Sequence, residues 1–232
     1  MKRKKMEYQL IEPMIEHLTG DVIDLTQDYA EMALDTFLQP GMLQDVPVIG
    51  TALKLGRSIL SIKDLIATRN YYVFISEMRK AAQADSILQK RIEEHLLTVE
   101  NDPEKRQKEI EWLLLYIERY KEQEKAKYMA NIYRAYLNNP VSGINWETAT
   151  AFFEILDRIL IQDICDFEKV FAKGASSQVF NDHSGLLRLS ALGLLQYFNG
   201  REEAYGHNKS GLAVVTSQGK LFYSIIKYGK AI

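Results

Sequence analysis

The residues in this sequence whose types most often take part in catalysis or metal binding are its histidines, its single cysteine and a few closely spaced carboxylates. The histidines are scattered, without cysteine or carboxylate neighbours at the short spacings of zinc ligands: His17, His95, His183 and His207. Cys165 has no histidine near it, and a buried small hydrophobe is the expected role of such a thiol. The sequence therefore predicts no metal site and no cofactor.

Two further patterns contain residue types used in catalysis. Asp182-His183-Ser184 has the composition of a triad, but adjacent loop residues rarely converge, so a turn or helix cap is the better interpretation. Carboxylates that share a helix face are typical of solvated charge: Glu154 with Asp157, and Asp163 with Asp166. Since no phosphate-binding glycine loop is present either, we expect a protein that is not an enzyme and takes no small-molecule substrate.

Length and composition are those of an ordered globular protein. The chain has 232 residues, 47% of them hydrophobic, enough for one large domain or two small ones. A net charge of −2 gives no general attraction to nucleic acid or anionic lipid. The basic residues 1–5 are not followed by the apolar segment of a secretion signal, and no apolar run is long enough to span a membrane. We expect a cytoplasmic location.

Residues 46–66 predict an amphipathic helix with Asp45 as its N-cap. Its apolar residues repeat in steps of three and four: Val48, Ala52, Leu55, Ile59, Ile62 and Ile66. Both close packing in a protein core and insertion at a membrane interface use such a face. Core packing is the default interpretation, and conditional contact with a membrane surface is the alternative because cationic residues border the face.

The first 140 residues predict a multi-helix body. Asn101-Asp102-Pro103-Glu104 is typical of a helix start, with Asp102 as the cap. Residues 121–125 contain no apolar side chain and are expected to form a turn or a solvated bridge. The tyrosines that follow are interpreted as packing residues with hydroxyls at the rim, rather than as a base-stacking platform: Tyr128, Tyr133 and Tyr136. Asn138-Asn139-Pro140 marks the predicted domain boundary.

Residues 141–232 predict a second module of helices and a short β-hairpin. Asn145 should cap a helix, a shorter helix should run from Asp163 to about Phe171, and residues 173–177 are turn-like. A further helix should end at Gly193. A hairpin with a strand at residues 212–215 then leads to a last helix capped by Thr216.

The order of a helix, Leu192-Gly193-Leu194, a hairpin and Thr216-Ser217-Gln218-Gly219 resembles the second half of winged-helix domains. The resemblance covers about the last 45 residues and implies a winged-helix-like architecture. The basic residues available for DNA contacts are few: Arg188, Arg201 and Lys209. Because Glu202 and Glu203 oppose them, a wing that contacts protein or is purely structural is favoured over DNA recognition.

Over the whole chain, D-x-P-V-x-G-T at residues 45–51 and S-I-x-D at residues 61–64 resemble a segment of small bacterial helical proteins. The resemblance implies a bacterial origin and a similar architecture, with a link to phage defence as a hypothesis, but it assigns no functional residues. We expect an interaction or adaptor protein that uses helix-mediated protein contacts or self-association. A membrane-active effector using helix 46–66 is the first alternative, and a winged-helix DNA-binding regulator is the second.

Overall fold

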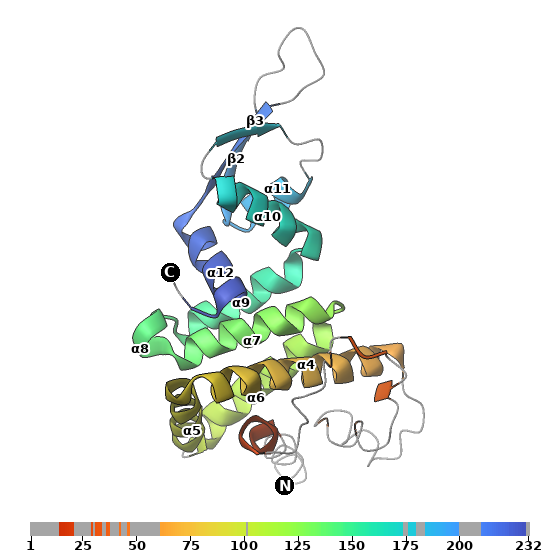
Figure 1. Cartoon of the computed structure of the whole chain (residues 1–232), viewed down its shortest axis with the longest axis vertical. Helices are drawn as coiled ribbons and strands as arrows, with labels where there is room; N and C mark the ends of the chain where they lie inside the picture. The colour runs from red at the N-terminus through yellow and green to blue at the C-terminus, as the bar shows by residue number, and fades with distance from the viewer. Residues whose placement is uncertain are drawn as a thin grey trace.

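The computed structural model describes residues 14–20, 29, 31–33, 36–37, 42, 46, 61–100, 102–173, 176–179, 184–199 and 210–230. Within these residues the chain is mainly helical, and a small antiparallel sheet lies near the C-terminal end (Figure 1). The predicted mainly α class with a short β element near the C-terminus is therefore confirmed.

Four long helices follow one another between residues 62 and 137: α4 (Ile62–Ala84), α5 (Ser86–Glu100), α6 (Pro103–Arg119) and α7 (Gln123–Leu137). The predicted start of α6 is confirmed, since the Asp102 carboxylate accepts a hydrogen bond from the Lys105 N–H at 3.2 Å. The turn expected at residues 121–125 is found at Lys121 and Glu122, between α6 and α7, but the expectation of a solvated bridge is wrong for Lys125. This side chain is buried in the first turn of α7 because its Nζ donates to the Asp157 carbonyl at 3.2 Å.

The prediction of one continuous helix over residues 46–66 is wrong at Ser61. Ser61 has an extended backbone, with φ −87° and ψ 161°, and it is the N-cap of α4. Its hydroxyl accepts a hydrogen bond from the Asp64 N–H, and the Asp64 carboxylate accepts one from the Ser61 N–H at 2.8 Å. This reciprocal capping starts a new helix at Ile62, because an N-cap residue does not have helical dihedral angles.

Helix α7 lies at the centre of the packing, between α4 on one side and α9 (Trp146–Arg158) and α12 (Ser217–Tyr228) on the other (Figure 1). It also caps the last helix, because Asn131 Nδ2 and Arg134 Nη2 each donate at 2.7 Å to carbonyls in the last turn of α12. The predicted boundary at residue 140 falls at the short helix α8 (Asn139–Ser142), but one hydrophobic core continues across it.

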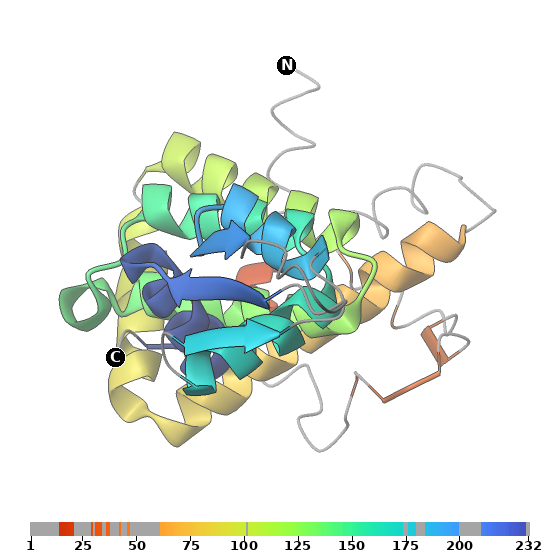
Figure 2. The same ribbon diagram turned by 90° about the horizontal axis from the view of Figure 1, so that it is seen from above.

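The C-terminal part contains α10 (Ile161–Lys173), β1 (Ser176–Val179), α11 (Ser184–Ala191), β2 (Leu195–Asn199), β3 (Ser210–Val215) and α12. The strands form an antiparallel sheet in the order β1-β3-β2, which lies over the helices when the molecule is seen from above (Figure 2). Strand β1 was missed in the sequence, where part of it was read as a turn. Its pairing with β3, from Ser176 opposite Ala213, brings together residues far apart in the chain.

Leu192-Gly193-Leu194 forms the C-terminal cap of α11. Gly193 has φ 74°, its N–H donates to the Ser190 carbonyl, and the Leu194 N–H donates to the Leu189 carbonyl, both at 3.0 Å. This is the Schellman arrangement, in which a left-handed residue satisfies the last carbonyls of a helix. Leu189 and Leu194 are both fully buried, so the cap also fixes the direction in which the chain enters β2.

Thr216 joins the end of the sheet to the start of α12. Its hydroxyl oxygen accepts a hydrogen bond from the Gly219 N–H at 2.9 Å, and the hydroxyl donates to the Gly193 carbonyl at 2.7 Å. Gly219 packs directly on the backbone, because a Cβ at this position would lie 1.9 Å from the Leu194 carbonyl oxygen. Glycine is therefore required three residues after Thr216, because a side chain there would collide with the Leu194 backbone.

We expect Gly219→Ala to lower the free energy of unfolding by about 3 kcal/mol or more, since the added methyl group forces α12 away from Leu194. Urea unfolding followed by circular dichroism measures this difference. The neighbouring exposed Gln218→Ala is the control and should change stability by less than about 0.5 kcal/mol. Equal unfolding midpoints for the two variants would show that α12 does not depend on this contact.

Candidate interaction surface

The described part of the chain shows no metal-ligand cluster and no membrane-spanning helix. No three His, Cys, Asp or Glu side chains lie together there as potential metal ligands, and none of its helices is both long and apolar enough to cross a bilayer. A cleft of about 110 Å³ lies between residues 14–19 and helices α4 and α5. Drug-sized ligands usually occupy pockets of about 300 to 1,000 Å³, so this cleft is too small for one.

The apolar residues predicted for a membrane or partner helix lie mostly outside the described residues: Val48, Ala52, Leu55 and Ile59. Of the other two, Ile62 is in the first turn of α4 and is largely exposed, while Ile66 is half-buried one turn later. The structure therefore brings these two residues onto α4, beyond the cap at Ser61.

The predicted wing contact Arg188 is engaged within the fold. Its guanidinium makes a bidentate pair with the Asp163 carboxylate, with Nε and Nη2 at 2.9 and 2.6 Å from the two oxygens. Asp163 is fully buried and also accepts the Leu160 N–H, so its expected role as a solvated charge is wrong. The other two predicted contacts, Arg201 and Lys209, lie outside the described residues.

Helix α6 carries an exposed stripe that the sequence reading did not single out. The stripe consists of residues three and four apart, all exposed: Lys105, Lys108, Trp112, Leu115 and Arg119. Trp112 is 39% exposed and Leu115 43%. Leu115 points away from the core side of the helix, and Trp112 lies at the edge of that side, one turn before the buried Tyr116. The sequence contained this signal, because Leu115 falls outside the face of the helix that the core residues define and Trp112 lies at the edge of that face. Apolar residues outside that face indicate a second apolar surface. We call these five residues the α6 stripe.

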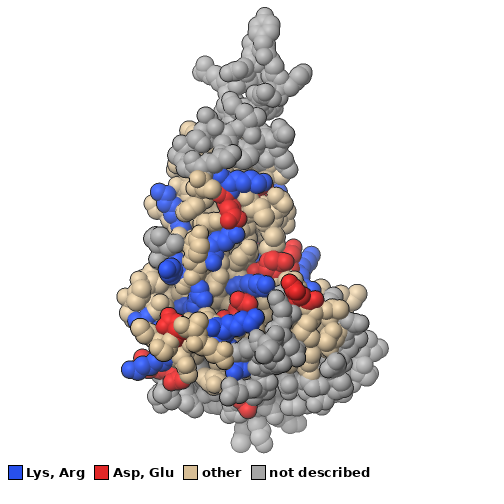
Figure 3. All heavy atoms as spheres, viewed as in Figure 1, with Lys and Arg blue, Asp and Glu red and all other residues tan. Residues whose placement is uncertain are grey.

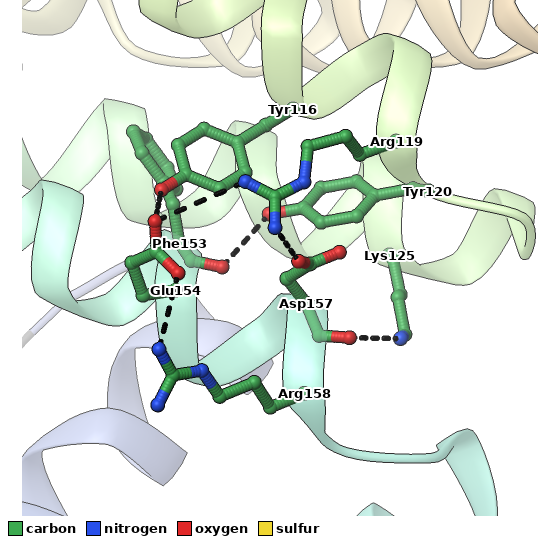
Figure 4. Close-up of polar contacts among 8 residues, drawn as sticks. All are labelled: Tyr116, Arg119, Tyr120, Lys125, Phe153, Glu154, Asp157 and Arg158. Atoms are coloured by element: carbon green, nitrogen blue, oxygen red, sulfur yellow. Dashed lines mark hydrogen bonds and ion pairs between the residues drawn. The ribbon is translucent and has the colours of Figure 1, made fainter.

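The α6 stripe is held against α9 by a cluster of charged and aromatic side chains (Figure 4). Tyr116 and Arg119 point from α6 toward Glu154 and Asp157 of α9. The Tyr116 hydroxyl donates to the Glu154 carboxylate, and Arg119 Nη2 donates to the Asp157 carboxylate. The interpretation of Glu154 and Asp157 as simple solvated charges is therefore wrong, because each bonds a side chain of a neighbouring helix.

Aromatic contacts fix the same side chains. The guanidinium carbon of Arg119 lies 5.4 Å from the centre of the Tyr116 ring, within cation–π distance, and the Trp112 ring stacks on Tyr116 at 5.7 Å. On the far side of the cluster, Arg158 Nη2 lies 3.7 Å from the Glu154 carboxylate and remains largely exposed. Trp112 and Arg119 are thus placed in advance of any contact with another molecule.

A buried polar network fixes the inner side of α6. The Glu109 carboxylate is 4% exposed and accepts a hydrogen bond from the Tyr133 hydroxyl at 2.6 Å. His95 Nε2 lies 2.8 Å from the same carboxylate, and the Tyr136 hydroxyl lies 3.4 Å from it. The tyrosines pack in the core as predicted, but the expectation that their hydroxyls lie at the rim is wrong for Tyr133, because a buried carboxylate supplies its acceptor.

The expectation of a buried Cys165 is also wrong, since its side chain is exposed. Helix α10 buries Ile164 and Phe167, and Cys165 falls between them in sequence, on the outward side of the helix.

Comparisons of the chain with protein-family models, with curated proteins and with solved structures found no match.

Glu109→Ala should lower the free energy of unfolding by about 2 to 4 kcal/mol, because it removes the buried carboxylate that accepts from the Tyr133 hydroxyl on α7 and contacts His95 on α5. Denaturant unfolding at neutral pH measures the loss. Glu111→Ala is the matched control: Glu111 is exposed, its carboxylate accepts a hydrogen bond from the Gln107 side chain of the same helix, and its loss should cost less than about 0.5 kcal/mol. A small effect of Glu109→Ala would mean that the network does not hold α6.

Alkaline pH should weaken the contact between α6 and α9. Burial first, and then the hydrogen bond to Glu154, raise the pKa of Tyr116 well above its ordinary value of 10.0. A raised pKa means that the folded state retains the proton longer, so this stabilisation is complete below pH 10 and is lost as pH rises toward the folded pKa. The loss of stability between pH 9 and pH 11 should therefore be smaller in Tyr116→Phe than in the wild type. An identical pH dependence in denaturant unfolding would contradict this role of Tyr116.

Proposed function

We propose that this protein is a non-catalytic interaction or adaptor protein that binds a protein partner through the α6 stripe. The observation that carries the proposal is the exposed pair Trp112 and Leu115 on a helix whose other sides are fixed. Glu109 anchors the buried side, and the contacts of Arg119 anchor the flank toward α9.

The α6 stripe and the Tyr116 side chain beneath it contain the residue types that are typical of binding hot spots. Tryptophan, tyrosine and arginine are the residue types that most often dominate the energy of protein interfaces. Here Trp112 stacks on Tyr116, and Arg119 lies over the same ring. Because these side chains are already ordered, less conformational entropy is lost when a partner binds.

We also propose that the C-terminal part is a winged-helix-like module that serves as a structural support or a protein contact. The sheet order β1-β3-β2, the cap at Gly193 and the Thr216–Gly219 contact support this architecture. DNA recognition is less favoured, since Arg188 is committed to Asp163 and the helix before β2 has only eight residues.

The charge distribution also supports a protein partner. The face drawn in Figure 3 carries basic side chains with acidic ones among them, rather than a field of one sign. Binding to a nucleic acid or an anionic membrane usually needs a predominantly basic surface. The membrane-effector hypothesis depends on the helix predicted at residues 46–66, of which 47–60 lie outside the described residues, and it stays a prediction from sequence.

Trp112→Gln with Leu115→Gln should remove the bound partner while preserving the fold, because glutamine keeps the helix and takes away the apolar contact. The experiment is affinity capture of the full chain from its native cells, with quantitative mass spectrometry. We expect at least one protein to be captured by the wild type and reduced about tenfold or more by the double variant.

The matched control is Ile87→Gln with Val141→Gln, which removes two exposed apolar side chains from α5 and α8 instead. This control should retain the captured protein. If the α6 double variant captures the same proteins as the wild type and melts at the same temperature, the proposed function is wrong. Leu115→Gln alone provides the test if the double variant is unstable.

A further inference from the structure

We infer that the partner of the α6 stripe presents an α-helix with carboxylates on either side of an apolar centre. This inference rests on the proposed function and names the chemistry of the partner. It is carried by the order of side chains along the stripe, which is cationic at both ends and apolar in the middle.

The cationic ends of the stripe are available for binding. Lys105 and Lys108 are exposed near the start of α6, and neither has an ion-pair partner among the described residues. At the other end, Arg119 Nη2 donates to Asp157 and Nη1 lies 3.9 Å from the Glu154 carboxylate, but a guanidinium has five N–H donors and this side chain is 42% exposed. Both ends can therefore accept a carboxylate from outside.

The spacing of the stripe defines the complementary helix. Lys108 and Arg119 are separated by about 16 Å along the axis, at 1.5 Å per residue. Trp112 and Leu115 lie between them. A partner helix would place apolar side chains opposite this pair and carboxylates about 11 residues apart opposite the two cations.

A broad anionic surface fits the stripe less well than a helix does. Beside the stripe, every seventh residue of α6 is acidic, at Glu104, Glu111 and Glu118, with Gln107 and Leu114 between them. Glu118 pairs with Lys63 at 2.7 Å. A bilayer or a nucleic-acid duplex would bring phosphates against these glutamates as well as against the lysines. A single helix, about 10 Å wide, can engage the stripe alone.

A second copy of the chain also fits less well. In a parallel two-fold pair of α6 helices, Lys108 would face Lys108 of the other copy. In an antiparallel pair centred on Trp112, Lys105 would face Arg119 of the other copy. Like charges therefore meet in either direction, whereas a helix with carboxylates would meet opposite charges throughout.

Two synthetic helical peptides test the inference against the full-length protein. Both carry the same central leucines; one has glutamates about 11 residues apart, and the other has lysines at those positions. Fluorescence anisotropy of the labelled peptides gives the Kd at low and at physiological salt. We expect the acidic peptide to bind at least about tenfold more tightly than the basic one, with a salt-dependent Kd.

Lys105→Glu with Lys108→Glu should weaken binding of the acidic peptide by about tenfold or more. Lys90→Glu with Lys220→Glu makes the same change of net charge at exposed positions on α5 and α12, and it should leave the Kd unchanged. Equal affinities for the two peptides, no binding of either, or equal effects of the two double variants would overturn the inference.

Two further outcomes would overturn it in favour of another ligand. One is binding of phosphatidylglycerol vesicles that is lost in Lys105→Glu with Lys108→Glu, with no binding of the acidic peptide. The other is a homodimer in light scattering that Leu115→Gln dissociates. These outcomes can be told apart from failure of the proposed function. The proposed function is tested by capture of the native partner, which depends on Trp112 and Leu115. A partner lost with those two residues but retained after lysine reversal would leave the surface correct and the charge rule wrong.

Discussion

The burial of α7 is the constraint on which the rest of the structure depends. This helix contacts α4 on one side and α9 and α12 on the other, so side chains from both halves of the chain enclose it. Asn131 and Arg134 also satisfy carbonyls at the end of α12. A helix enclosed in this way must satisfy its polar groups internally, since water does not reach them.

That requirement explains the polar residues within the core. Glu109, buried beside Tyr133, gives the tyrosine hydroxyl an acceptor, and Asn70 Nδ2 donates to the Tyr120 carbonyl at 2.7 Å, next to the end of α6. Lys125 reaches the Asp157 carbonyl in the same way. Each of these bonds permits one register of neighbouring helices, whereas apolar packing alone tolerates several. The position of α6 is thus set by specific polar contacts as well as by burial.

A helix fixed so firmly on its inner side can present a defined outer side. The α6 stripe gains its order from two sources: the buried network at Glu109 and the α9 carboxylates that hold Tyr116 and Arg119. The C-terminal part is also ordered by a few specific contacts. Those of Gly193, Thr216 and Gly219 connect α11, the β-sheet and α12. Both arrangements fix the position of a surface element relative to the core.

The sequence by itself determined the features that depend on neighbouring residues. Helix starts at Asp102, Asn145 and Thr216, and the helix end at Gly193, were predicted correctly because a cap is a contact within a few residues. The cap at Ser61 is also a contact between near neighbours in the sequence, but the regular apolar spacing through residues 46–66 obscured it.

Only the tertiary structure decided which charges are solvated. Asp157, Asp163 and Glu109 have the same side-chain chemistry as surface carboxylates, and each is held by partners 14 to 38 residues away in the chain. The pairing of β1 with β3 and the support of the α6 stripe by α9 are decided in the same way, because they depend on which distant segments the core brings together.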